Sequence, residues 1–469
     1  MKKLISLILA LVMVLGLCAC GGEAGQEGGK DAASTDGLQV GYAKINITPE
    51  YPVGMGGFSD QEKRIHTGLV GYIYATCIAV TSGEETILLY TIDIGGMNED
   101  RQKMFRPSIT QATGIAEDKI FMGSTHTHNA PATSGYPNAE RYVSDLTKWL
   151  VQVGTEAMAD RSPATFYQTK ANHEGMNFVR HYIMEDGTMV ANSDVSDPKK
   201  IVGHPMESDT LMTLLKFERA DETKKDIIMV NWQTHPADTD GLGYYNIGPD
   251  FVGPLRDKLE KDTGAHVAYF SGAVGNQVPD SKWKEEAHGL EWNEYGEKLA
   301  ELALPMLDNL QPVEGTQIKI LHYTFQAEVD HSWDHMLAEA NEVWNIYKST
   351  DRKTGDAAGE KYGFSSSYQA RAIRTRAEMG THIPMEMNVF CIGSVGFTTG
   401  TYEMFSDNGI YVKTNSPFDA TFMICGTSTY MPSDVTYTYR GYEQDTTYYA
   451  RGTGEAFAEK YVELLNQIK

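Results

Sequence analysis

Residues 120–132 read IFMGSTHTHNAPA, an apolar run of strand length that passes directly into two histidines spaced two positions apart. Side chains two positions apart on an extended backbone point to the same side of the chain. His126 and His128 can therefore line one site at the end of a strand.

The same arrangement recurs at the ends of other strand-like runs. Such runs are followed by Asp93, by His235 in NWQTHPADTD (231–240), by GNQVPD (275–280), by Glu403 in GTYEMF (400–405) and by Tyr430 in CGTSTYMPSD (425–434). In open α/β sheets the active site lies beyond the carboxyl ends of the strands. We therefore expect these segments to meet and to form the active site.

Strand-like runs alternate with amphipathic helical stretches along most of the chain. The predicted strands are residues 38–48, 72–81, 86–93, 120–125, 210–217, 226–233, 266–270, 316–325, 389–395 and 421–425. The predicted helices are residues 99–113, 139–159, 249–263, 290–307, 333–347 and 454–468. This alternation predicts an α/β layered domain of mixed β-sheets flanked by helices, with some parallel strand pairs. The polar, helix-like segment 330–381 predicts an insertion.

The N-terminal residues predict an export signal followed by a tether. Lys2 and Lys3 precede the apolar run 4–17, which is shorter than the roughly 20 residues that a membrane span needs. The sequence LCAC (17–20) resembles a bacterial lipobox, so we expect residues 1–19 to be a lipoprotein signal peptide. Cys20 is then the lipidated residue, which would anchor an exported, cell-surface protein to the membrane. The Gly- and acid-rich residues 20–37 predict a flexible tether. We expect residues 38–469 to form a single catalytic domain.

Composition excludes several classes of protein. The chain has 63 acidic and 40 basic residues, a formal net charge of -23. This balance argues against nucleic-acid binding and against a polybasic membrane-docking surface. Cys77, Cys391 and Cys425 each lie in an apolar, strand-like segment, so we expect buried thiols rather than a disulfide scaffold.

Two interpretations of the histidines are open from the residues alone. His126 and His128 are either a hydrogen-bonded pair in a loop or metal ligands, since imidazole is the commonest protein metal ligand. His235 alone is more typical of a structural histidine. Together with the first pair it could complete a zinc site, to which Glu403 would add a carboxylate.

Other motifs do not indicate a catalytic centre. His331 and His335 are spaced one helical turn apart, but Ser332 stands where an H-E-x-x-H metalloprotease has its glutamate. They lie in the polar insertion, so we expect them to face solvent. No G-x-S-x-G motif is present, so a serine hydrolase of the α/β-hydrolase type has no visible nucleophile.

These segments are similar, in the same order, to the catalytic domain of the neutral/alkaline non-lysosomal ceramidases. The shared motifs are KINITP (44–49), IDIGGM (92–97), GSTHTHNAPA (123–132), NFVR (177–180), NWQTHP (231–236), GNQVP (275–279), EMFSDNGIYVK (403–413), STYMPS (428–433) and GYE (441–443). The resemblance covers nearly all of residues 38–469. We expect no counterpart of the immunoglobulin-like C-terminal domain that the long ceramidases carry.

The resemblance implies a zinc site and an activity. The implied ligands are His126, His235, Glu403 and Tyr430. The implied reaction is hydrolysis of an amide (N-acyl) or ester bond by a zinc-activated water, whose pKa such a site lowers to about 7. The substrate would be a small-molecule or lipid acyl-amide.

The resemblance also places two residues around the scissile bond, His128 and Arg180. We expect His128 to act as proton shuttle, and Arg180 together with Tyr430 to stabilise the oxyanion. Asp93 is expected to orient a zinc ligand.

One loop departs from the family pattern. The ceramidases carry Gly-Asp-Val-Ser-Pro-Asn where this chain has GNQVPD (275–280), so that Val278 stands at the position of a serine with a catalytic role and Asn276 replaces an aspartate. We expect ceramide to be a poor substrate. We also expect Asn276 and Gln277 to hold water, which suits a smaller or more polar substrate.

Two alternatives to this function are open. The first is a non-catalytic binding lipoprotein that retains the fold. The second is a different zinc hydrolase on the same scaffold, acting on glycans or on wall peptides.

Overall fold

The computed structural model describes residues 37–58, 64–237 and 239–469. The predicted signal peptide, Cys20 and all but the last residue of the predicted tether lie outside the described residues. Within those ranges, no helix combines the length and the apolar character needed to cross a membrane.

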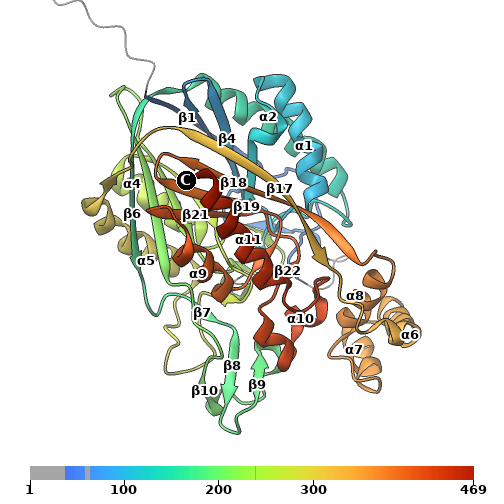
Figure 1. The fold of residues 1–469 in the computed structure, drawn as a ribbon. Helices are drawn as coiled ribbons and strands as arrows, with labels where there is room; N and C mark the ends of the chain where they lie inside the picture. The colour runs from blue at the N-terminus through green and yellow to red at the C-terminus, as the bar shows by residue number, and fades with distance from the viewer. Residues whose placement is uncertain (1–36, 59–63, 238) are drawn as a thin grey trace, which may run out of the picture. The chain divides into compact units, whose positions relative to one another are not determined.

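Two β-sheets pack against each other at the centre of the domain (Figure 1). The larger has the order β14-β12-β11-β6-β1-β3-β4-β5, with β16 added beside β6, and the smaller has the order β17-β18-β19-β21. The strands of the larger sheet are β1 (Leu38–Asn46), β3 (Tyr74–Ser82), β4 (Glu85–Ile92), β5 (Ile120–Ser124), β6 (Ser162–Asn172), β11 (Leu211–Arg219), β12 (Ile227–Trp232), β14 (His266–Ser271) and β16 (Gln311–Pro312). Those of the smaller are β17 (Ile318–Glu328), β18 (His382–Ile392), β19 (Val395–Gly400) and β21 (Ala420–Cys425).

Aromatic side chains form the contact between the two sheets. Phe121 of β5 stacks on Phe390 of β18 with ring centroids 4.4 Å apart. Phe270 of β14 meets Phe422 of β21 edge to face at 5.5 Å. These rings belong to a fully buried apolar layer, and burial of such side chains is the main driving force for folding.

Three parallel strand pairs explain how the strand ends come together. β4 pairs with β5, β12 with β14, and β19 with β21, all in parallel register. Parallel neighbours need a crossover connection, and here α1 (Glu99–Thr113), α4 (Val252–Thr263) and α9 (Ser406–Asn415) supply it. The predicted α/β architecture of mixed sheets flanked by helices is confirmed.

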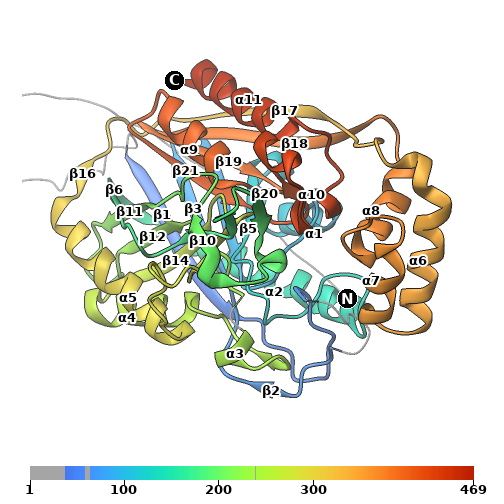
Figure 2. The same ribbon diagram turned by 90° about the horizontal axis from the view of Figure 1, so that it is seen from below.

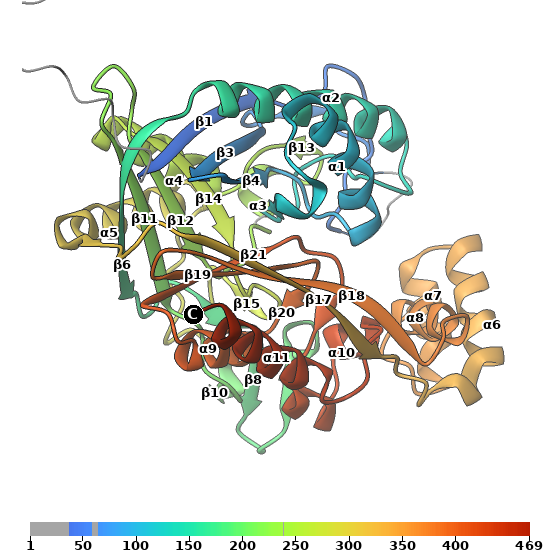
Figure 3. The same cartoon turned by 45° about the horizontal axis from the view of Figure 1, so that its top comes forward.

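Long helices cover the outer faces of the sheets (Figure 3). α1 and α2 (Ala139–Ala159) pack on β1, β3 and β4; α4 and α5 (Trp292–Ala303) pack on β12 and β14; α11 (Thr453–Ile468) packs on the smaller sheet. The packing of α2 on β1 depends on Gly41, where an added Cβ would lie 2.0 Å from the backbone oxygen of Ala157. Only glycine allows this approach of helix and strand.

A helical insertion separates β17 from its antiparallel partner β18 (Figure 2). It contains α6 (Leu337–Ser349), α7 (Arg352–Glu360) and α8 (Ser367–Ala377). Residues of α6, α8 and the loops beside them form a small apolar core of its own. α8 lies against α10 (Tyr442–Thr446) in the C-terminal region. The polar segment 330–381 thus forms an insertion, as predicted.

Several short strands pair outside the two main sheets. They are β2 (Gly68–Leu69) with β13 (Asn246–Ile247), β7 (Phe178–Val179) with β15 (Gln277–Val278), β20 (Glu403–Met404) with β22 (Tyr430–Met431), and the sheet β10-β8-β9 formed by Ile201–Gly203, His181–Met184 and Met189–Ala191.

The structure differs from the predicted elements in several places; among them, the helices α7, α8 and α9 were not predicted. The single strand predicted at 389–395 is wrong, because Gly393 (φ 55°) and Ser394 make a tight turn that divides the run into β18 and β19. β6 was not predicted, since half-exposed side chains interrupt its apolar pattern. The prediction of buried thiols is confirmed, because Cys77, Cys391 and Cys425 are all free and buried.

Candidate active site

Four of the predicted ligands meet where strands of both sheets end. His126 follows β5 and His235 follows β12, while Glu403 and Tyr430 begin β20 and β22. The last two strands are parallel neighbours, with Glu403 directly opposite Tyr430. Strand pairing therefore brings together two side chains that are 27 positions apart in the sequence.

Nitrogen and oxygen atoms of His126, His235 and Glu403, and of His128, converge on one point. Glu403 Oε2 lies 3.4 Å from His126 Nε2 and 3.4 Å from His235 Nε2. His128 Nε2 lies 3.3 Å from His126 Nε2, and the three histidines form a group whose ligand atoms lie within 4.8 Å of one another. Tetrahedral zinc with bonds of about 2.0–2.1 Å separates its ligand atoms by roughly 3.3–3.4 Å. The spacing fits a zinc ion.

Backbone carbonyl groups hold the imidazoles of His126 and His235 in the orientation that a metal ligand needs. His126 Nδ1 hydrogen-bonds to the oxygen of Gly95, and His235 Nδ1 lies 2.7 Å from the oxygen of Val274. A donor hydrogen on Nδ1 leaves the lone pair on Nε2 for the metal. His126 holds this position with φ 68°, a backbone conformation that residues other than glycine rarely adopt and that is typical of functional sites.

Two buried atoms at this point lack hydrogen-bond partners among the described residues, His235 Nε2 and Glu403 Oε2. Buried polar atoms in native proteins are nearly always satisfied, and each exception calls for an explanation such as an ion. A metal bound by these two atoms would satisfy both. The residues present therefore fit a zinc ion, which neutral imidazole and carboxylate ligands favour.

The protonation states agree with this interpretation. Burial, together with the nearby charges of Arg180 and His126, lowers the pKa of His235 to about 4. Burial together with His126 and His235 also holds the pKa of His128 well below its ordinary value. Burial alone would raise the pKa of Glu403, but its interactions with His126 and His235 hold that pKa far below the usual range. Neutral imidazoles and an ionised carboxylate are the forms that bind metal.

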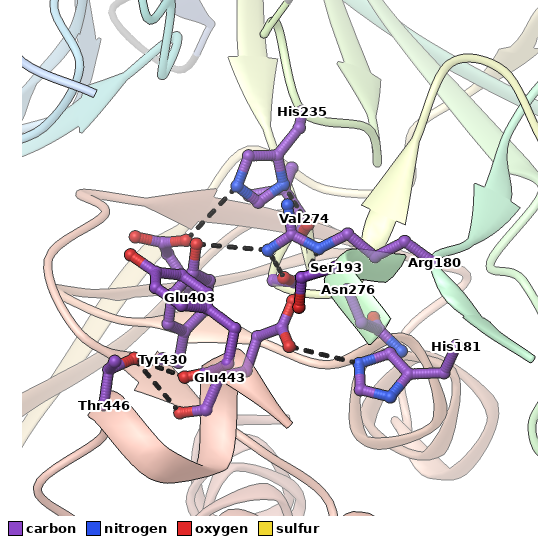
Figure 4. Close-up of polar contacts among 12 residues, drawn as sticks. Arg180, His181, Ser193, His235, Val274, Asn276, Glu403, Tyr430, Glu443 and Thr446 are labelled. Atoms are coloured by element: carbon purple, nitrogen blue, oxygen red, sulfur yellow. Dashed lines mark hydrogen bonds and ion pairs between the residues drawn. The ribbon is translucent and has the colours of Figure 1, made fainter. Parts of the chain in front are cut away.

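Arg180 and Tyr430 form a second group beside the first (Figure 4). Arg180 Nη2 donates to the Tyr430 hydroxyl at 3.1 Å and to the Gly275 oxygen at 2.9 Å. Burial raises the pKa of Tyr430 well above its ordinary value, and Glu403 raises it further. The structure thus brings together all the predicted ligands and both residues predicted at the scissile bond, His128 and Arg180.

Sequence reasoning assigned no role to the residues that hold Arg180. Arg180 Nε lies 2.7 Å from Glu443 Oε1, and the other oxygen of Glu443 lies 3.5 Å from His181 Nε2. The hydroxyl of Tyr439 completes the row, 2.9 Å from His181 Nδ1. Burial opposes ionisation of Glu443, but Arg180 and His181 lower its pKa to about 2. The motif GYE (441–443) and His181, which follows NFVR directly, were the available signals.

The role predicted for Asp93 is wrong. Its carboxylate makes a two-pronged ion pair with Arg256 of α4, at 3.0 and 2.7 Å, and also accepts from the backbone N–H of Tyr74 at 2.8 Å. Within the described residues it contacts no candidate zinc ligand. Asp93 therefore anchors α4 to the ends of β3 and β4.

The expectation that Asn276 and Gln277 hold water is also wrong. The Asn276 side chain accepts from the Ser406 backbone N–H at 2.8 Å and donates to the Ser406 hydroxyl at 3.2 Å. The Gln277 side chain accepts from the Asp209 N–H at 2.7 Å and donates to the Ala273 oxygen at 2.9 Å. Both amides are buried and hold the loop in place.

His331 and His335 lie in the insertion, apart from this centre. His331 is partly exposed and uses its nitrogens on Asp334 (2.9 Å) and the Gly380 oxygen (3.2 Å). His335 is exposed and stacks on Trp333.

A cavity of about 770 Å³ opens onto the centre. Its walls include His126, His128, Arg180, Val278, Glu403 and Tyr430. Enzyme and ligand pockets commonly have volumes of about 300–1,000 Å³, so a small organic molecule can reach all of these side chains.

The sequence matches no protein-family model and shows no significant similarity to a curated protein. Its fold, by contrast, is similar to that of solved structures. A neutral ceramidase from Pseudomonas aeruginosa superimposes with a TM-score of 0.68 and 14% sequence identity, over 92% of this chain and 75% of the other. A ceramidase complexed with C2 superimposes with a TM-score of 0.67 and 15% identity, over 92% and 76%. The chain therefore has the fold of the neutral ceramidases.

Proposed function

We propose that this protein is a zinc-dependent hydrolase of an amide (N-acyl) bond. The observation that carries the proposal is the convergence of two buried histidines and a buried glutamate, with unsatisfied Nε2 and Oε2 atoms, at a cavity that also contains Arg180. The similarity of the fold to solved ceramidases supports this choice of reaction class.

His126, His235 and Glu403 would hold the zinc ion, with Tyr430 completing the set. When bound, zinc supplies Lewis acidity and an activated water at neutral pH. We assign His128 to proton transfer, as the resemblance implies, although its Nε2 also lies at ligand spacing from His126 Nε2. The zinc content of His128→Ala separates the two roles. His128 Nε2 faces the same point and can accept a proton there and return it to the leaving amine.

Arg180 and the Tyr430 hydroxyl would bind the oxygen of the scissile carbonyl. The guanidinium is held by the Gly275 oxygen and by Glu443, so its orientation is established before substrate binds. Donors fixed in this way stabilise developing negative charge without reorganisation during the reaction.

A panel of short N-acyl amides, assayed with the zinc-loaded protein, tests the proposed reaction. Zinc-dependent release of free amine supports it. Bound zinc without hydrolysis of any substrate would contradict the proposed hydrolase function and would support a non-catalytic binding lipoprotein. Hydrolysis of glycans or wall peptides in place of N-acyl amides would instead identify the other alternative.

Ceramide is expected to be a poor substrate compared with these short amides. Val278 lines the cavity and can neither donate nor accept a hydrogen bond, and loss of one well-placed donor typically costs about 100- to 1000-fold in rate. Val278→Ser should raise ceramide hydrolysis by about tenfold, less than that full factor because the neighbouring Asn276 and Gln277 amides are already engaged. Release of the sphingoid base measures this. Efficient ceramide hydrolysis by the wild type, unchanged in Val278→Ser, would contradict the assigned role of this position.

We also propose that the protein is anchored to the membrane of the cell surface through lipid on Cys20. Two acyl chains on one residue give stable anchoring, whereas one chain binds only marginally. Cys20→Ser is expected to yield a protein whose mass lacks the diacylglycerol and which leaves the membrane fraction. An unmodified N-terminus on the wild-type protein, seen by mass spectrometry, would refute the proposal.

A further inference from the structure

The helical insertion forms part of the wall of the active-site cavity. Arg352, Tyr368 and Arg371 of α7 and α8 line the same cavity as His126 and Glu403. The insertion therefore contributes side chains that a bound molecule can contact, although it lies outside the two sheets that carry the zinc centre.

A row of aromatic rings connects the two parts of the cavity. The Tyr430 ring lies 5.8 Å from that of Tyr442, which lies 6.4 Å from that of Tyr368. The Arg371 guanidinium carbon is 5.3 Å from the centre of the Tyr368 ring. Arg371 is thus separated from the zinc centre by a few ring contacts, a span that one extended small molecule can bridge.

The environment of Arg371 differs from that of the other arginines in this region. Its guanidinium lies over Tyr368 and, at 6.0 Å, over Trp344. Contacts of this kind use the faces of the guanidinium and leave the N–H donors in its plane available. No carboxylate of the described residues lies within ion-pair distance of Arg371.

The neighbouring arginines, by contrast, are satisfied by the protein. Arg180 is paired with Glu443 at 2.7 Å, and Arg352 with Asp356 at 3.2 Å. In a chain with a net charge of -23, an arginine in a cavity without a carboxylate partner is unusual. Its planar donors match an anionic group such as a carboxylate.

The cavity wall carries many hydroxyl groups beside its apolar side chains. Tyr136, Tyr442 and Tyr448 line the cavity, together with the hydroxyl residues Thr133, Ser134 and Thr446. Hydroxyl groups that face a hydrocarbon chain would lose hydrogen bonds to water without replacement. These hydroxyl groups favour a polar molecule over a long acyl chain in the cavity.

We propose that the substrate carries an anionic group, a carboxylate or sulfonate several bonds from the scissile amide, and that Arg371 binds this group. The proposal rests on the proposed amide hydrolase function. The anionic group can belong to either the acyl or the amine part of the substrate, since both parts extend from the same carbonyl.

Two matched series of substrates test the proposal on the zinc-loaded protein. The first compares N-butanoyl ω-amino acids of increasing length with N-butanoyl ω-amino alcohols, which lack only the charge. The second compares anilides of ω-carboxy acids with those of unsubstituted acids. We expect the charged members of one series to have the higher kcat/KM, and the series that shows this identifies the part that carries the anion.

Arg371→Gln should lower kcat/KM for the preferred charged substrate by about 10- to 100-fold, the usual range for loss of a hydrogen bond to a charged group. The kcat/KM for the matching neutral substrate should stay close to that of the wild type. Arg374→Gln is the matched control, because it removes the same charge from the same helix at a side chain that bonds to Asn341 (2.6 Å) and does not line the cavity.

The proposal is wrong if neutral substrates are hydrolysed as well as charged ones, or if both variants lose the preference equally. If no amide is hydrolysed at all, the proposed reaction is wrong. Calorimetric binding of the same carboxylates to the wild type and both variants then tests whether Arg371 binds an anionic group. Binding that weakens in Arg371→Gln but not in Arg374→Gln supports the anion site without that reaction. Equal binding to all three proteins contradicts it.

Discussion

Replacement of His126 or of His235 by alanine is expected to remove most of the zinc from the protein. The wild type is expected to bind close to one ion per chain. His126→Ala or His235→Ala leaves too few ligands, and the loss of even a supporting hydrogen bond to a ligand commonly costs about 10- to 100-fold in affinity. Amide hydrolysis should fall to the background rate in both variants. Elemental analysis of the dialysed proteins measures the zinc.

Two further variants make this test specific. His331→Ala should retain full zinc and activity, because His331 bonds to Asp334 and the Gly380 oxygen within the insertion. His128→Ala should retain zinc but lose activity, which separates a proton shuttle from a third imidazole ligand. Full zinc in both His126→Ala and His235→Ala would show that the centre has been placed wrongly.

Replacement of Arg180 by glutamine is expected to lower kcat by about 100- to 1000-fold, the usual effect of removing one donor to a developing oxyanion. Arg180 Nη2 donates to the Tyr430 hydroxyl at 3.1 Å, so the variant loses both the cation and the group that orients the phenol. Zinc content should stay close to that of the wild type, since Arg180 is not a ligand. Steady-state kinetics on a short N-acyl amide, with parallel zinc analysis, measures both quantities.

Glu443→Gln tests the same group more mildly, because it removes the charge that holds Arg180 and leaves Arg180 itself in place. The amide keeps the shape of the side chain but removes the charge that faces Arg180 Nε at 2.7 Å. We expect a smaller loss of kcat than in Arg180→Gln, because the Gly275 oxygen still holds the guanidinium. A kcat unchanged in Arg180→Gln, with a raised KM alone, would mean that Arg180 binds substrate and does not stabilise the transition state.

The candidate site residues other than Arg180 could be found in the sequence because each of them follows a strand-like run, whereas Arg180 was indicated only by the resemblance of NFVR (177–180). His126, His235 and Tyr430 are each preceded by a short apolar run, and a side chain that follows such a strand is carried to the edge of the sheet. The boundaries of two helices were similarly accessible, since residues 99–113 and 139–159 match α1 and α2 as observed. β6 was missed because its half-exposed side chains carry little apolar pattern.

Interactions between segments distant in the sequence could not be inferred in this way. Asp93 also follows a strand, and only the position of α4 shows that its carboxylate pairs with Arg256 and not with a candidate metal ligand. The amides of Asn276 and Gln277 looked available in the sequence, but Ser406 and Asp209 occupy them.

The sequence by itself therefore determined the α/β class, the insertion and the residue types of the candidate zinc site, because periodicity and strand ends are local properties of the chain. The tertiary structure decided which polar groups are satisfied by other parts of the protein and which are left for a ligand. Glu443 became a support of Arg180, and Arg371 was left without a carboxylate partner among the described residues. The physical reason is that the partner of a buried or cavity-lining charge is set by packing between distant segments, which no local pattern records.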